Sequence, residues 1–299
     1  MEKEITRFDS ICQYNDYLGQ PTLHPLVSVI DMSKAPLLKS RRYIFGFYVV
    51  FLKDVKCGDM LYGRHYYDYQ EGTLVFLAPG QVIGIDNPDL TVRPKGMALC
   101  FHPDLLRNTS LGRNMKEYTF FSYEVNEALH LSQQERNTIL DCLSNIDVEL
   151  QHAIDKHSKT LIVSNIELFL NYCIRFYDRQ FITRNHVNSD LLGRFERLLD
   201  DYFHSDKPHT LGLPSVRWCA GELNLSPNYF GDLIKKETGQ SASEHIQQKL
   251  INTAKERIFD TGLSISQIAY SLGFQYPQHF SRLFKKHVGC SPNEYRFRS

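Results

Sequence analysis

Two polar segments near the C-terminal end combine amide, guanidinium and ammonium side chains at helical spacing. The first segment carries Asn228, Tyr229, Asp232, Lys235 and Lys236, and the second carries Gln278, His279, Ser281, Arg282, Lys285 and Lys286. Asparagine, glutamine and arginine can form paired hydrogen bonds with base edges in the major groove, whereas lysine mostly contacts phosphates. These residue types predict a surface that contacts double-stranded DNA, and we expect the named side chains to form it.

The two segments belong to an internal repeat. Val216, Cys219, Ala220, Leu223 and Leu225 match Ile265, Ile268, Ala269, Leu272 and Phe274 at an offset of 49, which becomes 50 from Pro227 and Pro277 onward. Each copy has a short helix with alanine on its apolar face, a tight turn and a second helix, which is the helix-turn-helix pattern. One copy alone would equally suit an ordinary helical bundle with a solvated basic face, whereas two copies in register favour DNA binding.

The repeat predicts helix-turn-helix units over 215–239 and 264–288, joined by a helix over 243–260. At 1.5 Å per residue this joining helix would be about 27 Å long. A rigid spacer of that length could place two recognition helices in successive major grooves, about 34 Å apart.

Residues 264–296 closely resemble the second helix-turn-helix signature of the AraC/XylS family of bacterial transcription regulators. The matching residues include Ile268-Ala269, Gly273-Phe274, Phe280, Phe284-Lys285-Lys286, Gly289, Ser291-Pro292 and Tyr295-Arg296. The resemblance covers roughly residues 190–299 and is looser over 215–239. It implies an all-α domain that binds promoter DNA and recruits or excludes RNA polymerase.

The resemblance also implies which positions contact bases. In this chain they are Asn228, Gly231, Asp232 and Lys235 in the first unit, and Gln278, Ser281, Arg282 and Lys285 in the second. Asp232 departs from the usual pattern, because a carboxylate near phosphates is unfavourable, and it aligns with Arg282. We therefore expect the first unit to read fewer bases and Arg282 to read a base directly, the alternative being a phosphate contact only.

The N-terminal part predicts a different architecture. Short strands over 43–52, 72–79 and 97–101 make 20–125 β-rich, and helices follow over 132–180, beginning at a capping box of Ser132 and Glu135. The expected fold class is α+β in two domains, 1–185 and 190–299, with the polar run 186–190 as a linker. The segment 69–81 resembles the N-terminal domain of the same regulators, which implies a cupin-like β-barrel followed by dimerisation helices.

The N-terminal part leaves several interpretations open. The apolar face of the helix over 161–178 could pack on its own β-domain or form a homodimer. A small-molecule effector could bind Arg64, His65 and Tyr67 among the aromatic residues, or those aromatics could form the core. The alternatives for the whole chain are a ligand-independent regulator whose N-terminal domain only dimerises, and a cupin enzyme fused to a DNA-binding domain.

Composition and spacing exclude several other classes. His65 and His102 lack the paired histidines of a cupin metal site, and no catalytic triad or phosphate loop stands out, so we expect no metal, no cofactor and no catalytic residues. Net charge is zero, but 264–299 holds five basic residues against Glu294 alone. Seven dispersed cysteines without a CxxC pair fit a reducing cytoplasm, which the family resemblance implies is bacterial, and no apolar run is long enough for a membrane span.

Overall fold

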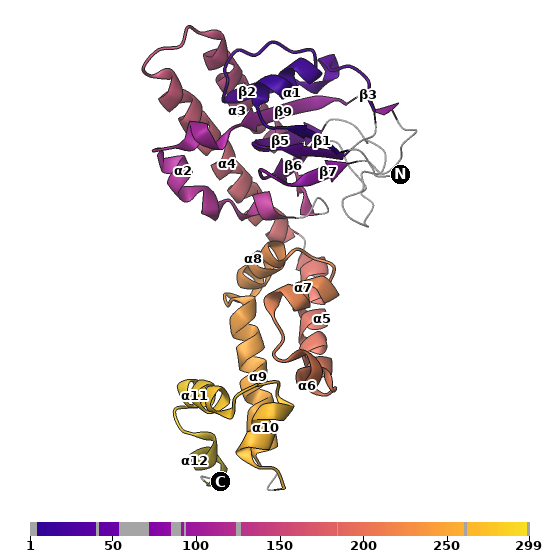
Figure 1. Ribbon diagram of the computed structural model, residues 1–299, viewed down its shortest axis with the longest axis vertical. Helices are drawn as coiled ribbons and strands as arrows, with labels where there is room; N and C mark the ends of the chain where they lie inside the picture. Colours follow the sequence, from indigo (N-terminus) through magenta and orange to yellow (C-terminus); the bar gives the residue numbers. More distant parts are fainter. Residues whose placement is uncertain are drawn as a thin grey trace. The chain divides into compact units, whose positions relative to one another are not determined.

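The chain forms two compact units, Met1–Thr183 and Arg184–Ser299 (Figure 1). The computed structural model describes residues 5–39, 42–53, 72–84, 91–92, 94–123, 127–183, 185–259 and 262–297. The polar run 186–190 lies inside helix α5 (Asn185–Phe203), so the chain is helical where its composition predicts a linker. Within the described residues, no helix is both long and apolar enough to cross a membrane.

The first unit combines β-sheets with helices. Its five-stranded antiparallel sheet has the order β10 (Leu129–His130), β6 (Thr73–Leu77), β5 (Tyr48–Lys53), β9 (Gly96–Phe101) and β2 (Val27–Asp31). A three-stranded sheet contains β1 (Ile5–Phe8), β4 (Arg42–Phe45) and β7 (Val82–Gly84), and a third pairs β3 (Leu38–Lys39) with β8 (Thr91–Val92). The predicted strands over 72–79 and 97–101 correspond to β6 and β9.

Helices and short helical turns complete the first unit. They are α1 (Ile11–Tyr17), α2 (Ser110–Asn114), α3 (Gln133–Gln151), α4 (Ser158–Thr183), and the 3₁₀ turns η1 (Met32–Lys34), η2 (Pro103–Leu106), η3 (Met115–Glu117) and η4 (Thr119–Ser122). The predicted capping box is confirmed: Ser132 and Glu135 cap the start of α3 reciprocally.

The apolar run 43–52 is two strands, and not the single strand that its composition predicts. The break lies at Gly46, whose N–H donates to the carbonyl oxygen of Phe8 at 2.8 Å. A Cβ at Gly46 would lie 3.2 Å from the Cα of Asp9, so only glycine allows the backbones to approach without displacement. This corner passes the chain from the three-stranded to the five-stranded sheet.

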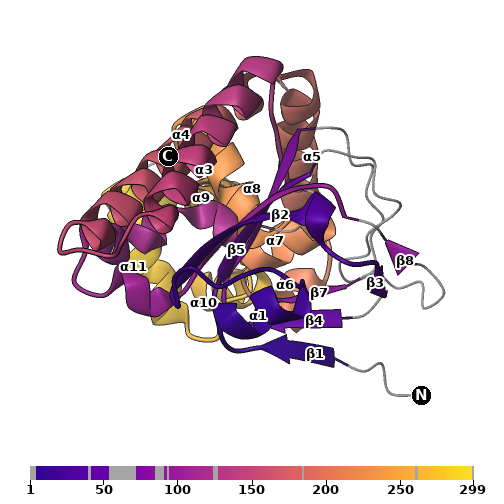
Figure 2. The same cartoon turned by 90° about the horizontal axis from the view of Figure 1, so that it is seen from above.

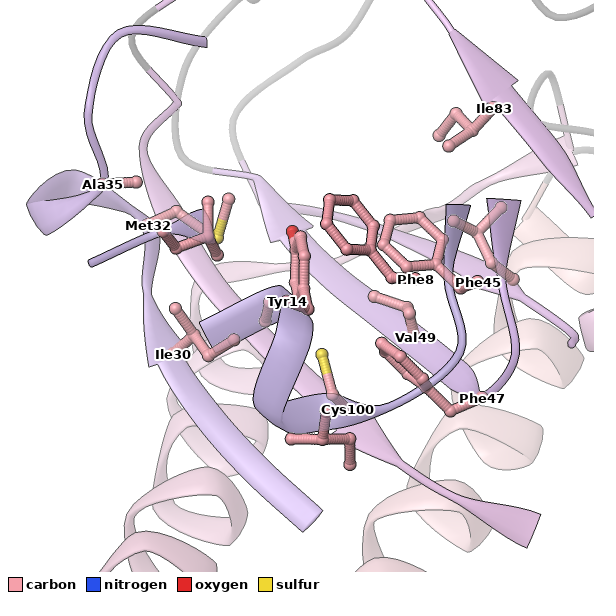
Figure 3. Close-up of a cluster of buried hydrophobic side chains, with 14 residues drawn as sticks. Phe8, Tyr14, Ile30, Met32, Ala35, Phe45, Phe47, Val49, Ile83 and Cys100 are labelled. Atoms are coloured by element: carbon pink, nitrogen blue, oxygen red, sulfur yellow. The ribbon is translucent and has the colours of Figure 1, made fainter. Parts of the chain in front are cut away.

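One face of the five-stranded sheet covers an aromatic core (Figure 3). Val49 pairs with Leu77 on one side and Cys100 on the other, and all three belong to this core cluster. Phe45 and Tyr14 of α1 meet edge to face at 5.1 Å between ring centroids. The aromatic residues of β4 and β5 that the structure describes therefore contribute largely to the core, as one of the two interpretations predicts.

The opposite face of the same sheet packs against helical segments. Phe76 of β6 lies 4.4 Å from the ring of Phe120 in η4 and 6.1 Å from that of Tyr177 in α4. Helices α3 and α4 lie side by side in this layer (Figure 2). Both faces of β6 are consequently buried, which explains why its sequence is a continuous apolar run instead of an alternating one.

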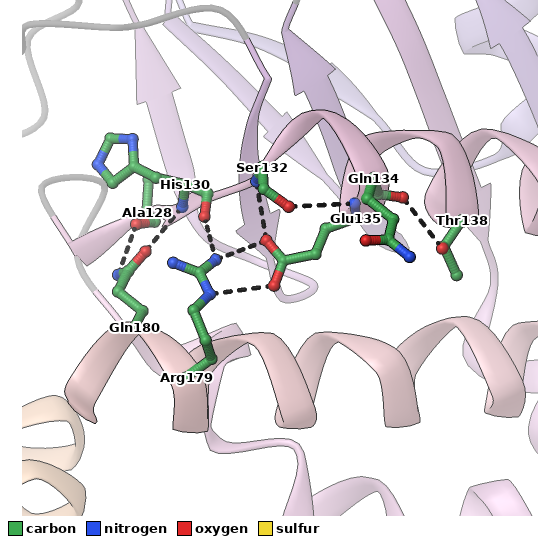
Figure 4. Close-up of polar contacts among 8 residues, drawn as sticks. All are labelled: Ala128, His130, Ser132, Gln134, Glu135, Thr138, Arg179 and Gln180. Carbon is green, nitrogen blue, oxygen red and sulfur yellow. Dashed lines mark hydrogen bonds and ion pairs between the residues drawn. The ribbon is translucent and has the colours of Figure 1, made fainter. Parts of the chain in front are cut away.

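A polar network fastens the last turns of α4 to the sheet (Figure 4). Arg179 donates from Nε and Nη2 to the two carboxylate oxygens of Glu135 at 3.0 and 2.7 Å, and from Nη2 to the carbonyl oxygen of His130 at 2.7 Å. Gln180 accepts from the His130 N–H at 2.8 Å and donates to the Ala128 carbonyl at 3.2 Å. One glutamine side chain thus pairs with the backbone of β10 and of the residue before it, as a neighbouring strand would.

We predict that Arg179→Ala destabilises the first unit by about 2 kcal/mol, because charge-assisted hydrogen bonds to a mostly buried Glu135 are lost. Arg175→Ala on the exposed face of α4 is the control and should change stability by less than about 0.5 kcal/mol. Urea unfolding followed by far-ultraviolet circular dichroism measures the change. The chain has a single tryptophan, Trp218 in the second unit, so its fluorescence transition should not move. Equal effects of the two variants would contradict the network's role.

The second unit is entirely helical in its described residues. After α5 come α6 (Lys207–Leu211), α7 (Val216–Glu222), α8 (Pro227–Thr238), α9 (Ala242–Ile258), α10 (Ile265–Ser271), α11 (Pro277–Val288) and α12 (Pro292–Phe297). Helix α9 has α8 packed toward one end and α10 toward the other (Figure 1). Its bounds agree closely with the predicted joining helix over 243–260.

Candidate nucleic-acid interface

The internal repeat is reproduced in the backbone of α7–α8 and α10–α11. After α7, Leu225 N–H donates to the carbonyl of Ala220 at 2.9 Å, and after α10, Phe274 N–H donates to that of Ala269 at 3.0 Å. The turn residue has a positive φ in both copies, 58° at Asn224 and 95° at Gly273. Both predicted units are therefore helix-turn-helix structures whose turns begin in the same way, and the second turn is one residue longer.

The small residue predicted at each helix crossing is buried. Ala220 and Ala269 are fully buried, which lets the second helix of each unit pass close to the first. The expected apolar faces are also confirmed: Phe230, Leu233 and Ile234 in α8 and Phe280 and Phe284 in α11 are buried, and Leu283 is partly buried.

The sequence match continues through Gly239 and Ser241, which correspond to Gly289 and Ser291. Gly239 and Gly289 end α8 and α11 with φ of 74° and 85°. The serine two residues later, Ser241 or Ser291, then donates its N–H to a glutamate three residues on, at 2.7 Å in both copies. The glutamates Glu244 and Glu294 repeat at the offset of 50, so this shared helix start was visible in the sequence.

Most of the predicted contact residues lie on open helix faces. The exposed ones are Asn228, Lys235 and Lys236 in α8, and Gln278, His279, Arg282, Lys285 and Lys286 in α11. Asp232 and Ser281 are half-buried at the edges of these faces. At Gly231 an added Cβ would meet no heavy atom within 4 Å, so this position offers open backbone.

Tyr229 is a correction to the predicted surface. Its side chain is only 5% exposed, so it belongs to the core side of α8 and not to the polar face. Tyr229 lies four residues before Leu233 on the same stripe of the helix, and its aromatic ring is buried there. The corresponding His279 in α11 is exposed instead, with its ring 5.5 Å from that of Tyr276.

Tyr276 is an exposed residue at this surface that the residue-type argument missed. It is the N-cap residue of α11, is 55% exposed and directly precedes the turn that carries Gln278. The first copy has Ser226 in the same role, where the serine hydroxyl accepts from Tyr229 N–H at 3.2 Å. The available signal was the difference between the two turns: Gln275 is the inserted residue, and Tyr276 places an aromatic side chain where the first helix-turn-helix unit has Ser226.

Basic side chains gather in the last turns of both second helices. Lys235 and Lys236 lie in the last turn of α8, and Lys285, Lys286 and His287 lie in the last turn of α11. Cations at a helix C-terminus are favoured by the helix dipole, and here they leave the first turns to the amide side chains Asn228 and Gln278. Each helix therefore presents hydrogen-bonding groups at its start and positive charge at its end.

The predicted effector-binding residues belong to the N-terminal part of the chain. Arg64, His65 and Tyr67 fall outside the described residues. His102 accepts from the backbone N–H of Asp104 at 3.2 Å and caps η2, which is an ordinary structural role. Across the described ranges, no group of three or more histidine, cysteine, aspartate or glutamate side chains could hold a metal ion.

Comparison with known proteins agrees with this geometry. The fold and the paired surfaces define a double helix-turn-helix domain. A family model described as a helix-turn-helix domain matches residues 219–298, and the second unit carries a domain of the AraC type.

Curated relatives match mainly this region. The chain is 37% identical over 91 residues to the uncharacterized transcriptional regulatory protein YesN of Bacillus subtilis, covering 29% of this chain and 25% of that protein. It is 32% identical over 158 residues to the uncharacterized HTH-type transcriptional regulator YijO of Escherichia coli, covering 53% and 51%. The chain thus matches between a quarter and about half of the length of these two relatives.

A solved structure, the C-terminal domain of AraT, a response regulator from Geobacillus stearothermophilus, is 29% identical. The match covers 36% of this chain and 85% of that domain, with a TM-score of 0.32.

Proposed function

We propose that this protein is a sequence-specific DNA-binding transcriptional regulator in which α8 and α11 enter the major groove. The observation that carries the proposal is the pair of exposed polar faces, repeated at the two ends of α9 on the same helix-turn-helix scaffold. The relatives YesN and YijO, described as transcriptional regulators, support the assignment of the class.

The dimensions of α9 suit contact with successive grooves. Its 17 residues span about 26 Å. Neighbouring major grooves on one side of B-DNA are about 34 Å apart, and the two helix-turn-helix units contact α9 through α8 toward one end and α10 toward the other. A single chain could therefore read two adjacent groove segments, with α11 supplying Gln278 and Arg282 and α8 supplying Asn228 and Lys235.

The N-terminal compact unit, Met1–Thr183, would control this binding. We propose a cupin-like effector domain in which a small molecule alters promoter binding, and thereby the recruitment or exclusion of RNA polymerase. Homodimerisation would use α4. Most of its apolar residues pack within their own unit, but Leu161 and Leu168 remain 47% and 45% exposed on one stripe. A regulator without an effector stays the alternative, and a ligand that raises the melting temperature of the chain would distinguish them.

Selection from random duplexes followed by band-shift titration tests the function. We expect the full chain to enrich a discrete sequence and to bind it at least about a thousandfold more tightly than unrelated DNA. Affinity should fall steeply between 50 and 200 mM salt, since several lysines and arginines release counterions from phosphates.

A matched pair of variants localises the surface. Gln278→Ala should weaken binding to the selected site, whereas Gln133→Ala, an exposed glutamine at the start of α3, should not. Failure to enrich any sequence, with or without added small molecules, would reject the proposed function.

A further inference from the structure

The two helix-turn-helix units are connected by a second helix besides α9. Helix α5 contacts the first helix-turn-helix unit, α7–α8, through Phe195, whose ring meets Phe230 of α8 edge to face at 5.0 Å. The other end of α5 contributes Tyr202 and Phe203 to the buried cluster that contains Ile268 of α10 and Phe280 of α11. One helix therefore lies in the cores of both units.

Helices α5 and α9 also bind each other between these ends. Lys249 of α9 forms an ion pair with Asp200 of α5, and the two helices are in contact. Because two helices joined side by side resist bending and twisting more than one, this α5–α9 pair makes a stiffer connection than the joining helix alone.

Arg257 of α9 connects α5 with the second helix-turn-helix unit, α10–α11. Its Nη1 donates to the carbonyl oxygen and the hydroxyl of Ser271, at 3.1 and 2.9 Å, and its Nη2 donates to the carbonyl oxygen of Phe203. Ser271 is the last residue of α10 and Phe203 the last of α5. Carbonyls at a helix end lack partners within the helix and carry its negative dipole, so one guanidinium satisfies two helix ends at once.

A backbone contact lies beside this bridge. Gly273 in the turn of the second unit approaches Gly212 after α6 so closely that a Cβ there would stand 2.5 Å from the Gly212 carbonyl oxygen. The same oxygen accepts from the Tyr202 hydroxyl at 2.9 Å. The second helix-turn-helix unit is thus connected to the rest of the domain through α10 as well as through α9.

We propose that Arg257 is a positioning residue that fixes the orientation of the second helix-turn-helix unit relative to the first, and thereby sets the spacing of the two DNA segments that the protein accepts. The inference rests on the proposed function. Each added base pair shifts the second segment by about 3.4 Å and rotates it by about 34°. A rigidly held pair of recognition helices cannot follow that displacement, whereas a pair that has lost the Arg257 bridge between α5 and α10 can follow it further.

The test compares Arg257→Gln with Lys255→Gln, a control that removes the same charge from the same turn of α9. Using the full chain, dissociation constants are measured on the selected operator and on versions with one base pair inserted or deleted between the two contacted segments. Wild type and K255Q should lose about tenfold or more in affinity on the altered operators, and R257Q less than about threefold. A merely structural role would lower the affinity for all three operators by the same factor, and that result overturns the proposal.

A measurement without DNA separates this inference from the proposed function. Spin labels on a ketone-bearing amino acid, introduced in place of Lys236 and Lys286, report the distance between α8 and α11. The distance distribution should be narrow in wild type and K255Q and clearly broader in R257Q. An unchanged width in R257Q refutes the inference, whereas a wild-type chain that enriches no sequence refutes the proposed function and leaves the distance result to decide on Arg257.

Discussion

Replacing Arg282 with alanine should abolish most of the sequence preference at one base position of the selected operator. Arg282 is exposed on α11, one turn after Gln278, where a guanidinium can donate two hydrogen bonds to a guanine. Losing such a pair reduces discrimination by about 1–3 kcal/mol, or roughly 5- to 150-fold between the preferred base and its substitutes. Titration of the variant against the four single-base operators at that position measures the effect.

Lys286→Ala is the matched control, because it removes one positive charge from the same helix. As a phosphate contact, Lys286 should contribute equally to all sequences, so its loss should weaken binding uniformly and reduce the salt dependence by about one counterion. Equal and uniform losses from both variants would show that Arg282 also contacts only phosphate.

The α8 and α11 surfaces were largely predictable because their pattern is local and duplicated. Ala220 and Ala269 mark the helix crossings, and the offset of 49 or 50 separates core from surface positions without any tertiary information. Tyr229 was misplaced because an aromatic residue with a hydroxyl suits either a polar face or a core. The spacing to Leu233 does not decide between them, because His279 has the same spacing to Leu283 in α11 and is exposed.

Features that depend on distant contacts could not be read from the chain in this way. Gly46 breaks an apolar run that looks like one strand, and the cause is the backbone of Phe8 and Asp9 in another sheet. The polar run 186–190 resembles a linker, yet it begins α5. The role of Arg257 likewise depends on carbonyls of Phe203 and Ser271, whose convergence no local spacing reveals.

Gly273→Ala should destabilise the second unit by about 3 kcal/mol. Alanine at a φ of 95° costs about 1–2 kcal/mol through backbone strain. The added Cβ would in addition stand 2.5 Å from the Gly212 carbonyl oxygen, and because both sides of this contact are backbone, relief requires α6 and α10 to separate, at a further cost of about 1–3 kcal/mol.

Gly239→Ala distinguishes backbone strain from the close approach to the Gly212 carbonyl oxygen. Gly239 has a similar φ of 74°, but a Cβ there meets nothing within 4 Å, so this variant should lose only about 1 kcal/mol through strain. Urea unfolding followed by the fluorescence of Trp218 measures both, since its ring lies 4.6 Å from that of Tyr202, whose hydroxyl binds Gly212. Equal unfolding midpoints for the two variants would mean that the Gly212–Gly273 approach contributes nothing to stability. A midpoint clearly lower for G273A than for G239A would establish that close backbone packing, and not the turn conformation by itself, requires glycine at this position.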